Sequence, residues 1–145
     1  MDNETFASIY EQDPSLVDSQ DAYGYTPLMI AVMSGRTEVA DFLIAKGSNL
    51  SHVDKDGHNV VHWAVVCGQK AHLLHYSTAA EEIPSDTAIA ILHTLLKKGA
   101  HVNCVDIDER TPILWAASNG NIEALISLTQ AGGDIQTIIV RARRF

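Results

Sequence analysis

The chain has 145 residues, of which 46% are hydrophobic and 19% charged, a composition typical of one globular domain with its own core and not of a disordered segment. No apolar run approaches the roughly 20 residues that a membrane helix needs, so we expect no direct membrane insertion. The net charge is −8, and the first 35 residues carry six acids and no base, which argues against nucleic acid as a partner.

The first predicted element is an amphipathic helix at residues 3–12. Phe6, Ile9 and Tyr10 follow the i, i+3, i+4 spacing of one helical face, and Asp2 or Asn3 can serve as its N-cap. The N-terminus carries acids where a secretory signal would carry bases. Because the chain also has only two cysteines, we expect a reducing compartment, the cytoplasm, with the nucleus as the alternative.

Three segments of the chain then repeat one pattern. They are 21–31 (DAYGYTPLMIA), 54–64 (DKDGHNVVHWA) and 106–116 (DIDERTPILWA), and a leucine-rich run ending in Gly47, Gly99 or Gly132 follows each. Thr-Pro favours a helix start, because proline is tolerated in the first helical turn. Glycine supplies the left-handed residue that ends a helix. Each unit is therefore predicted to be a turn, a short helix, a second turn and a longer helix.

The middle unit contains an insertion. The first two segments start 33 residues apart, whereas the third starts 52 residues after the second. The 19 extra residues lie at about 69–87, because the distance from unit start to closing glycine is 26 in the outer units and 45 in the middle one. This stretch is either a second contact surface or a tolerated insertion at a turn.

A 33-residue period with T-P-L, alanine, glycine and a leucine-rich helix closely resembles the ankyrin repeat family, over roughly residues 21–136. The resemblance implies an all-α repeat solenoid, an ankyrin helix-turn-helix stack with short hairpin loops. The single domain would comprise a capping half-repeat (1–20), repeat 1 (21–53), repeat 2 (54–105), repeat 3 (106–138) and a divergent basic tail (139–145). The tail sequence IVRARRF does not match the template, so we expect a truncated array, a fragment, or a divergent or unnatural tail.

Several positions depart from the ankyrin template. Asn59-Val60 replaces Thr-Pro and Glu109 replaces the hairpin glycine, and both changes are expected to weaken their hairpins modestly. His62 is the one template histidine, for which the resemblance implies a hairpin-bracing role. Asn103 resembles the asparagine that some ankyrin repeats present for hydroxylation, and is a candidate modification site.

No motif for catalysis or metal binding accompanies the repeats. Seven histidines suggest a metal site, but the chain has no Cys-x-x-Cys or His-Glu-x-x-His spacing. Neither Cys67 nor Cys104 has the histidine and acid that an activated thiol needs. We therefore expect no enzyme activity, no metal and no cofactor.

The resemblance implies a protein-protein interaction module, an adaptor or scaffold, that binds its partner on the concave face of hairpin tips and first helices. Two alternatives are a free-standing ankyrin inhibitor that docks on and blocks an enzyme, and a targeting domain cut from a larger enzyme or channel. The acidic surface predicts a partner that offers a basic segment with apolar anchors, and the chain is expected to be a monomer or part of a larger chain. The corresponding positions are Tyr23, Tyr25, Met33, Lys55, Asp56, His58, Trp63, Val66, Ile107, Asp108, Arg110, Trp115, Ser118 and Asn119.

Two groups of these residues each have two possible roles. Tyr23 and Tyr25 either contact the partner or pack on the capping helix. Trp63 and Trp115 share one template position with Ile30, so the three should form a row along the stack. That row is either part of the core or a partly exposed strip of anchors.

Overall fold

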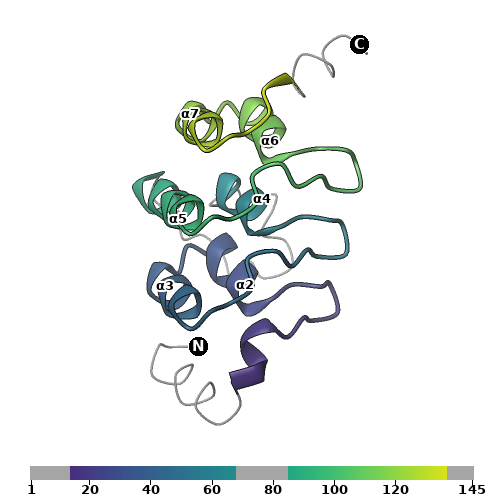
Figure 1. The fold of residues 1–145 in the computed structure, drawn as a ribbon, viewed down its shortest axis with the longest axis vertical. Helices are drawn as coiled ribbons and strands as arrows, with labels where there is room; N and C mark the ends of the chain where they lie inside the picture. The colour runs from purple at the N-terminus through teal and green to yellow at the C-terminus, as the bar shows by residue number, and fades with distance from the viewer. Residues whose placement is uncertain (1–13, 68–84, 137–145) are drawn as a thin grey trace.

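The computed structural model describes residues 14–67 and 85–136. The first described element is a 3-10 helix, η1 (Pro14–Asp18). Three helix pairs follow it in the described residues: α2 (Pro27–Met33) with α3 (Thr37–Ala45), α4 (Val60–Val65) with α5 (Ser85–Lys97), and α6 (Pro112–Ser118) with α7 (Ile122–Gln130). The pairs stack along one axis, and the hairpin loops project on one side of the stack (Figure 1). With no strand in the described residues, the expected all-α repeat solenoid is confirmed.

Three sequence predictions fall outside the described residues. They are the helix at 3–12, most of the insertion at 69–87 and the tail at 139–145. The last residues of the insertion are described, and they extend α5. That helix has 13 residues, whereas α3 and α7 have nine each and end at the same distance before their glycines. The inserted segment therefore ends in an added turn at the start of α5.

The short first helices begin at capping side chains. The Thr26 hydroxyl accepts a hydrogen bond from the Met29 amide at 3.2 Å, and Thr111 accepts one from Leu114 at 3.4 Å. In the middle unit, the Asn59 side chain accepts from the amides of Val61 and His62 at 3.0 and 3.1 Å. Asparagine is among the best N-cap residues, so the cap that Thr-Pro would supply is retained. The expectation that Asn59 weakens this unit overlooked its capping chemistry.

A continuous apolar core runs through the stack between the two layers of helices. Leu28, Leu43, Leu92 and Leu128 are fully buried, and they come from all three helix pairs. One pair alone cannot cover its apolar face, so each depends on its neighbours for burial. The hairpins are consequently held on a rigid base.

Successive hairpins approach each other closely at their glycines. Gly57 has a φ of +83°, and a Cβ added there would lie 3.0 Å from the Cα of Asp106 in the next hairpin. In the third hairpin, Glu109 takes the corresponding left-handed conformation with a φ of 61°. This is the last hairpin described. The substitution of this glycine by Glu109 thus adds a side chain but leaves the backbone conformation of the hairpin unchanged.

Candidate functional site

Each hairpin folds around the aspartate that begins its unit. Oδ1 of Asp21 accepts hydrogen bonds from the amides of Tyr23 and Tyr25, both at 2.9 Å. Oδ1 of Asp54 does the same for residues 56 and 58, and Oδ1 of Asp106 for residues 108 and 110, at 2.8 to 3.0 Å. The aspartate that begins each unit therefore sets one tip shape three times, with glycine in the left-handed position of the first two hairpins and Glu109 in that of the third.

Backbone hydrogen bonds join the tips into a row. The Lys55 amide donates to the Tyr23 carbonyl at 3.0 Å, and the Ile107 amide donates to the Asp56 carbonyl at 2.9 Å. The side chains at the tips are thus carried on backbone that is fixed from one repeat to the next. Such fixed positions reduce the ordering cost of binding.

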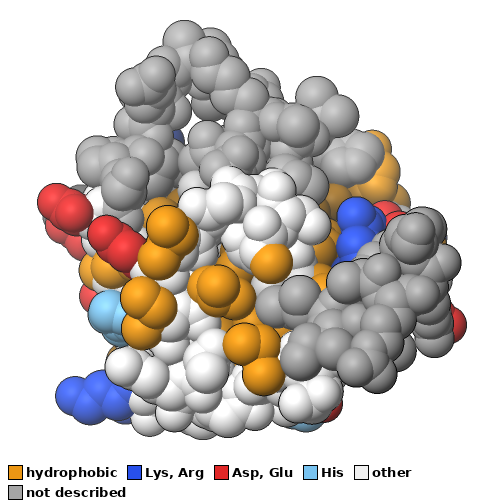
Figure 2. Space-filling view, turned by 90° about the horizontal axis from the view of Figure 1, so that it is seen from above, with side chains coloured by type: hydrophobic (Ala, Val, Ile, Leu, Met, Phe, Trp, Pro, Cys, Tyr) orange, Lys and Arg blue, Asp and Glu red, His pale blue; other side chains and the backbone are white. Residues whose placement is uncertain are grey.

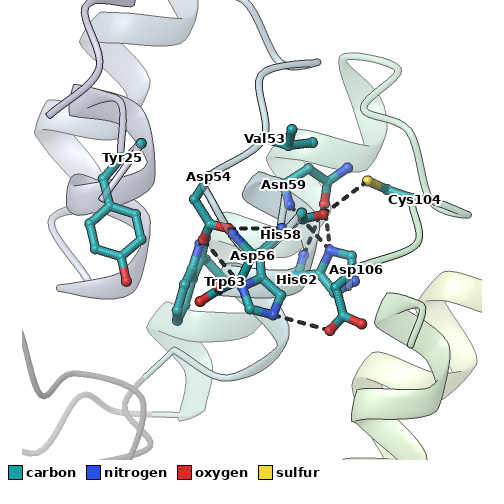
Figure 3. Close-up of polar contacts among 12 residues, drawn as sticks. Tyr25, Val53, Asp54, Asp56, His58, Asn59, His62, Trp63, Cys104 and Asp106 are labelled. Atoms are coloured by element: carbon teal, nitrogen blue, oxygen red, sulfur yellow. Dashed lines mark hydrogen bonds and ion pairs between the residues drawn. The ribbon is translucent and has the colours of Figure 1, made fainter. Parts of the chain in front are cut away.

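A buried polar cluster lies beneath the tips of the second and third hairpins (Figure 3). The His58 ring lies between two carboxylates, with Nδ1 3.2 Å from Asp54 Oδ2 and Nε2 3.1 Å from Asp106 Oδ2. The indole N–H of Trp63 donates to Asp54 Oδ2 at 3.1 Å. Burial alone would raise the pKa of Asp54, but hydrogen bonds from the His58 side chain and amide outweigh it and lower that pKa. Asp54 therefore stays ionised in this cluster.

His62 ties the first helix of the middle unit to the third hairpin. Its Nδ1 accepts a hydrogen bond from the Asn59 amide at 3.2 Å, and its Nε2 lies 3.0 Å from the Arg110 carbonyl. A ring that accepts at one nitrogen and donates at the other is neutral. Burial lowers the pKa of His62 to about 4.

Acidification is therefore expected to destabilise the stack through His62. An unfolded histidine takes up its proton near pH 6.5 whereas the folded ring does so near 4, so stability is full above the first value and falls toward the second. The loss amounts to about 3 kcal/mol over this window. Urea unfolding at several pH values measures it, with His62→Gln as the control that keeps a donor for Arg110. Equal pH dependence in both proteins would contradict this role.

The aromatic residues form a row, and most of it is buried. Tyr25 packs on Trp63 at 5.6 Å between ring centroids, and Trp63 packs on Trp115 at 6.0 Å. Both indoles are only 4% exposed. The Arg110 guanidinium covers the Trp115 ring at 5.5 Å. The tryptophan row thus lies in the core, and offers a partner no strip of anchors.

The predicted contact residues divide into an exposed and a buried set. The exposed set is Tyr23, Lys55, Asp56, Ile107, Asp108, Ser118 and Asn119, with Arg110 partly exposed; the buried set is Tyr25, Met33, His58, Trp63, Val66 and Trp115. As a prediction of accessible surface, the buried set needs correction. These side chains pack against the core or the hairpin network, and they support the surface from beneath.

Asn103, the candidate modification site, joins two successive turns. Its amide group donates to the Gly132 carbonyl at 3.2 Å, and its side-chain oxygen accepts from the Asp134 amide at 2.9 Å. The side chain is partly buried. A structural role for Asn103 is therefore established by its contacts, whereas its modification stays a prediction.

Sequence reasoning missed two features of the surface and its support. Asp54 and Asp106 hold the hairpin network through their carboxylates, a role that the sequence indicates only by the recurrence of aspartate at the start of each unit. Ile122 and Ile126, at 68% and 52% exposed on α7, are not among the predicted contact residues. Figure 2 looks down on the α6–α7 end and shows apolar side chains gathered there.

The described residues contain no group of three or more His, Cys, Asp or Glu side chains that could hold a metal ion. A search of the same residues finds no helix with the length and apolar character to cross a membrane.

Comparison with known proteins points to one family. Residues 2–81 match a family model described as ankyrin repeats (3 copies), and residues 77–128 match one described as ankyrin repeats (many copies). The structure is similar to an ankyrin repeat domain from Acinetobacter baumannii AYE, with a TM-score of 0.67, 30% identity, and coverage of 81% of this chain and 53% of that one.

Two curated proteins are also similar in sequence. The phosphocholine transferase AnkX of Legionella pneumophila is 25% identical over 152 aligned residues, which cover 86% of this chain and 16% of that protein. An ankyrin repeat and LEM domain-containing protein 1 homolog of Caenorhabditis elegans is 35% identical over 65 residues, 45% of this chain and 9% of that protein. The chain thus spans a small part of the curated relatives that it matches.

Proposed function

The chain belongs to the ankyrin repeat family, whose repeats generally serve as protein-interaction modules, and we propose that it is a non-catalytic adaptor or scaffold that binds a partner protein along the hairpin-tip face. This face comprises the exposed residues Tyr23, Lys55, Asp56, Ile107 and Asp108, with Ser118 and Asn119 at the end of α6. It extends over the three proposed repeats, 21–53, 54–105 and 106–138.

The observation that carries the proposal is the presence of large apolar side chains on rigid, exposed tips. Tyr23 is 46% exposed and Ile107 is 68% exposed. The Ile107 amide and the Tyr23 carbonyl both bond to the middle hairpin, so the two anchors keep a fixed spacing. Aromatic and aliphatic anchors held in place are typical of binding hot spots.

The charges on this face favour a partner with a basic segment. Asp56, Asp108 and Glu109 are exposed on the tips, against one exposed lysine, Lys55. The nearby cation of Arg110 is engaged within the chain, because Nη2 lies 2.8 Å from Asp108 Oδ2 and Nε lies 3.4 Å from Asp106 Oδ2. Complementary charge raises association rates and excludes acidic competitors. We therefore propose a partner that combines a basic segment with apolar anchors. The chain would bind it as a monomer or as part of a larger chain, in the cytoplasm or nucleus.

Ile107→Ala is expected to weaken partner binding roughly tenfold or more, and Tyr23→Ala to act in the same direction. Affinity purification with mass spectrometry identifies proteins that the wild type retains, and calorimetry then gives their affinities. Ile122→Ala is the matched control, because Ile122 has the same side chain and the same 68% exposure but lies on α7. A partner that tolerates both tip variants and is lost with Ile122→Ala would place the binding surface on α7 instead.

A second candidate function is recognition on behalf of a larger enzyme. It is favoured by the similarity to the phosphocholine transferase AnkX, of which the chain spans 16%. A free-standing inhibitor that docks on and blocks an enzyme is the related alternative. The size of the native protein on an immunoblot, and the presence or loss of activity in an enzyme that it captures, distinguish these roles from an adaptor.

A further inference from the structure

His58 bridges two hairpins with both of its ring nitrogens. Nδ1 faces Asp54 in its own hairpin at 3.2 Å, and Nε2 faces Asp106 in the next hairpin at 3.1 Å. The side chain of His58 is 10% exposed, and those of the two aspartates are 2% and 0% exposed. Water therefore does not mediate these contacts or readily replace them.

Neither carboxylate can turn away from the ring. The second oxygen of each, Oδ1, accepts two backbone amides of its own hairpin. The indole N–H of Trp63 also donates a hydrogen bond to Oδ2 of Asp54. The positions of both acceptors are thus fixed by the fold, whatever the state of the ring between them.

The number of protons on the ring decides whether both contacts are attractive. A neutral imidazole has one N–H and one lone pair, whereas the imidazolium has two N–H groups. With a neutral ring, one nitrogen would direct its lone pair at a buried carboxylate. With a protonated ring, both nitrogens donate charge-assisted hydrogen bonds.

Most of the other titratable groups near His58 are uncharged. His62, at 5.3 Å between ring centroids, is neutral because burial lowers its pKa to about 4. Tyr25 is neutral because burial and the nearby aspartates raise its pKa to about 12. Burial likewise raises the pKa of the Cys104 thiol, which donates to the Gly57 carbonyl. Asp56, on the hairpin tip, adds a negative charge and Arg110, beside Asp106, a positive one.

We propose that the proton on His58 acts as a clasp between repeats two and three, so that the coupling of these repeats depends on pH. The junction between repeats one and two lacks this device, because the position of His58 is occupied there by Tyr25, which packs edge-on against Trp63. The clasp is a property of the stack and does not depend on the proposed function.

The direction of the pH effect follows from the geometry. The clasp is closed while His58 carries its second proton, so the coupling between repeats two and three should be stronger at about pH 6 than at about pH 8, because acid favours the imidazolium over the neutral ring. It should fall again in stronger acid, where Asp54 is protonated and His62, with its pKa of about 4, gains a buried charge.

Nitrogen NMR of the imidazole rings in the wild-type protein tests the clasp without any substitution. At about pH 6, both nitrogens of His58 should have the chemical shifts of protonated nitrogens, while His62 should show one protonated nitrogen and one bare nitrogen. A His58 ring with one bare nitrogen at this pH would overturn the proposal.

A double-mutant cycle of His58→Gln and Asp106→Asn then measures the coupling itself. The equilibrium coupling should be roughly tenfold at about pH 6 and close to twofold at about pH 8. His62 contributes to all four proteins of the cycle, so its own pH effect largely cancels. A cycle on His93 and Ser127 is the control, because their 2.9 Å hydrogen bond also joins repeats two and three but involves no carboxylate. Equal coupling for the His58 cycle at both pH values would refute the clasp.

Discussion

Trp63→Ala is expected to lower the free energy of unfolding by about 3 to 5 kcal/mol, a large part of the stability of a small domain. The indole is 4% exposed and packs edge-on against Tyr25, His58 and Trp115, so its loss opens a cavity shared by all three repeats. Its N–H also donates to Asp54, which would lose that partner inside the protein. Urea unfolding followed by circular dichroism measures the change.

Tyr23→Ala is the control for this substitution. Tyr23 is 46% exposed on the first hairpin tip, so its removal should change the free energy of unfolding by less than about 1 kcal/mol. Similar losses for the two variants would contradict the placement of the tryptophan row in the core. The pair also separates stability from binding, since only Tyr23→Ala should weaken a partner while leaving the fold intact.

Gly24→Ala is expected to cost about 2 to 4 kcal/mol, because it combines an unfavourable backbone conformation with a clash between repeats. Gly24 has a φ of +82°, and an added Cβ would lie 2.8 Å from the Lys55 nitrogen and 3.0 Å from the Asp54 Cα. Both atoms belong to the backbone of the next hairpin, so no side chain can move aside. The hairpins would have to separate, and the hydrogen bond from Lys55 to Tyr23 would lengthen.

Gly47→Ala isolates the contribution of the clash. Gly47 has a φ of +84°, almost the same as Gly24, but nothing lies within 4 Å of an added Cβ. Only the backbone term should remain, at about 1 kcal/mol. Thermal or urea unfolding of both variants gives the difference. If Gly47→Ala proved as destabilising as Gly24→Ala, the close approach of the hairpins would not be the cause.

The periodicity of the sequence was sufficient to predict the helix pairs and their order, because helix starts and ends depend on local chemistry. Thr26-Pro27 and Thr111-Pro112 begin helices for reasons contained in a few residues. Asn59 shows the limit of comparison with a template. It departs from Thr-Pro in identity, yet it caps α4 and also donates to the His101 carbonyl at 2.8 Å.

Whether a row of equivalent residues lies in the core or on the surface was harder to predict. The 33-residue spacing aligns Trp63 with Trp115, but it does not show whether neighbouring side chains cover them. The Arg110 guanidinium covers the Trp115 ring, and Asp54 accepts a hydrogen bond from the Trp63 indole. Both contacts depend on the geometry of the hairpins. The His58 bridge joins residues 48 positions apart and exists only once two repeats are stacked.

Site-specific photo-cross-linking tests the central claim, that a partner binds along the hairpin-tip face. A benzophenone amino acid placed at position 107 lies on the third tip, and one placed at position 122 lies on α7 with equal exposure of the native isoleucine. We expect the captured partner to cross-link from position 107 and not from position 122. Cross-linking from position 122 alone would contradict the account and place the binding surface on the helices.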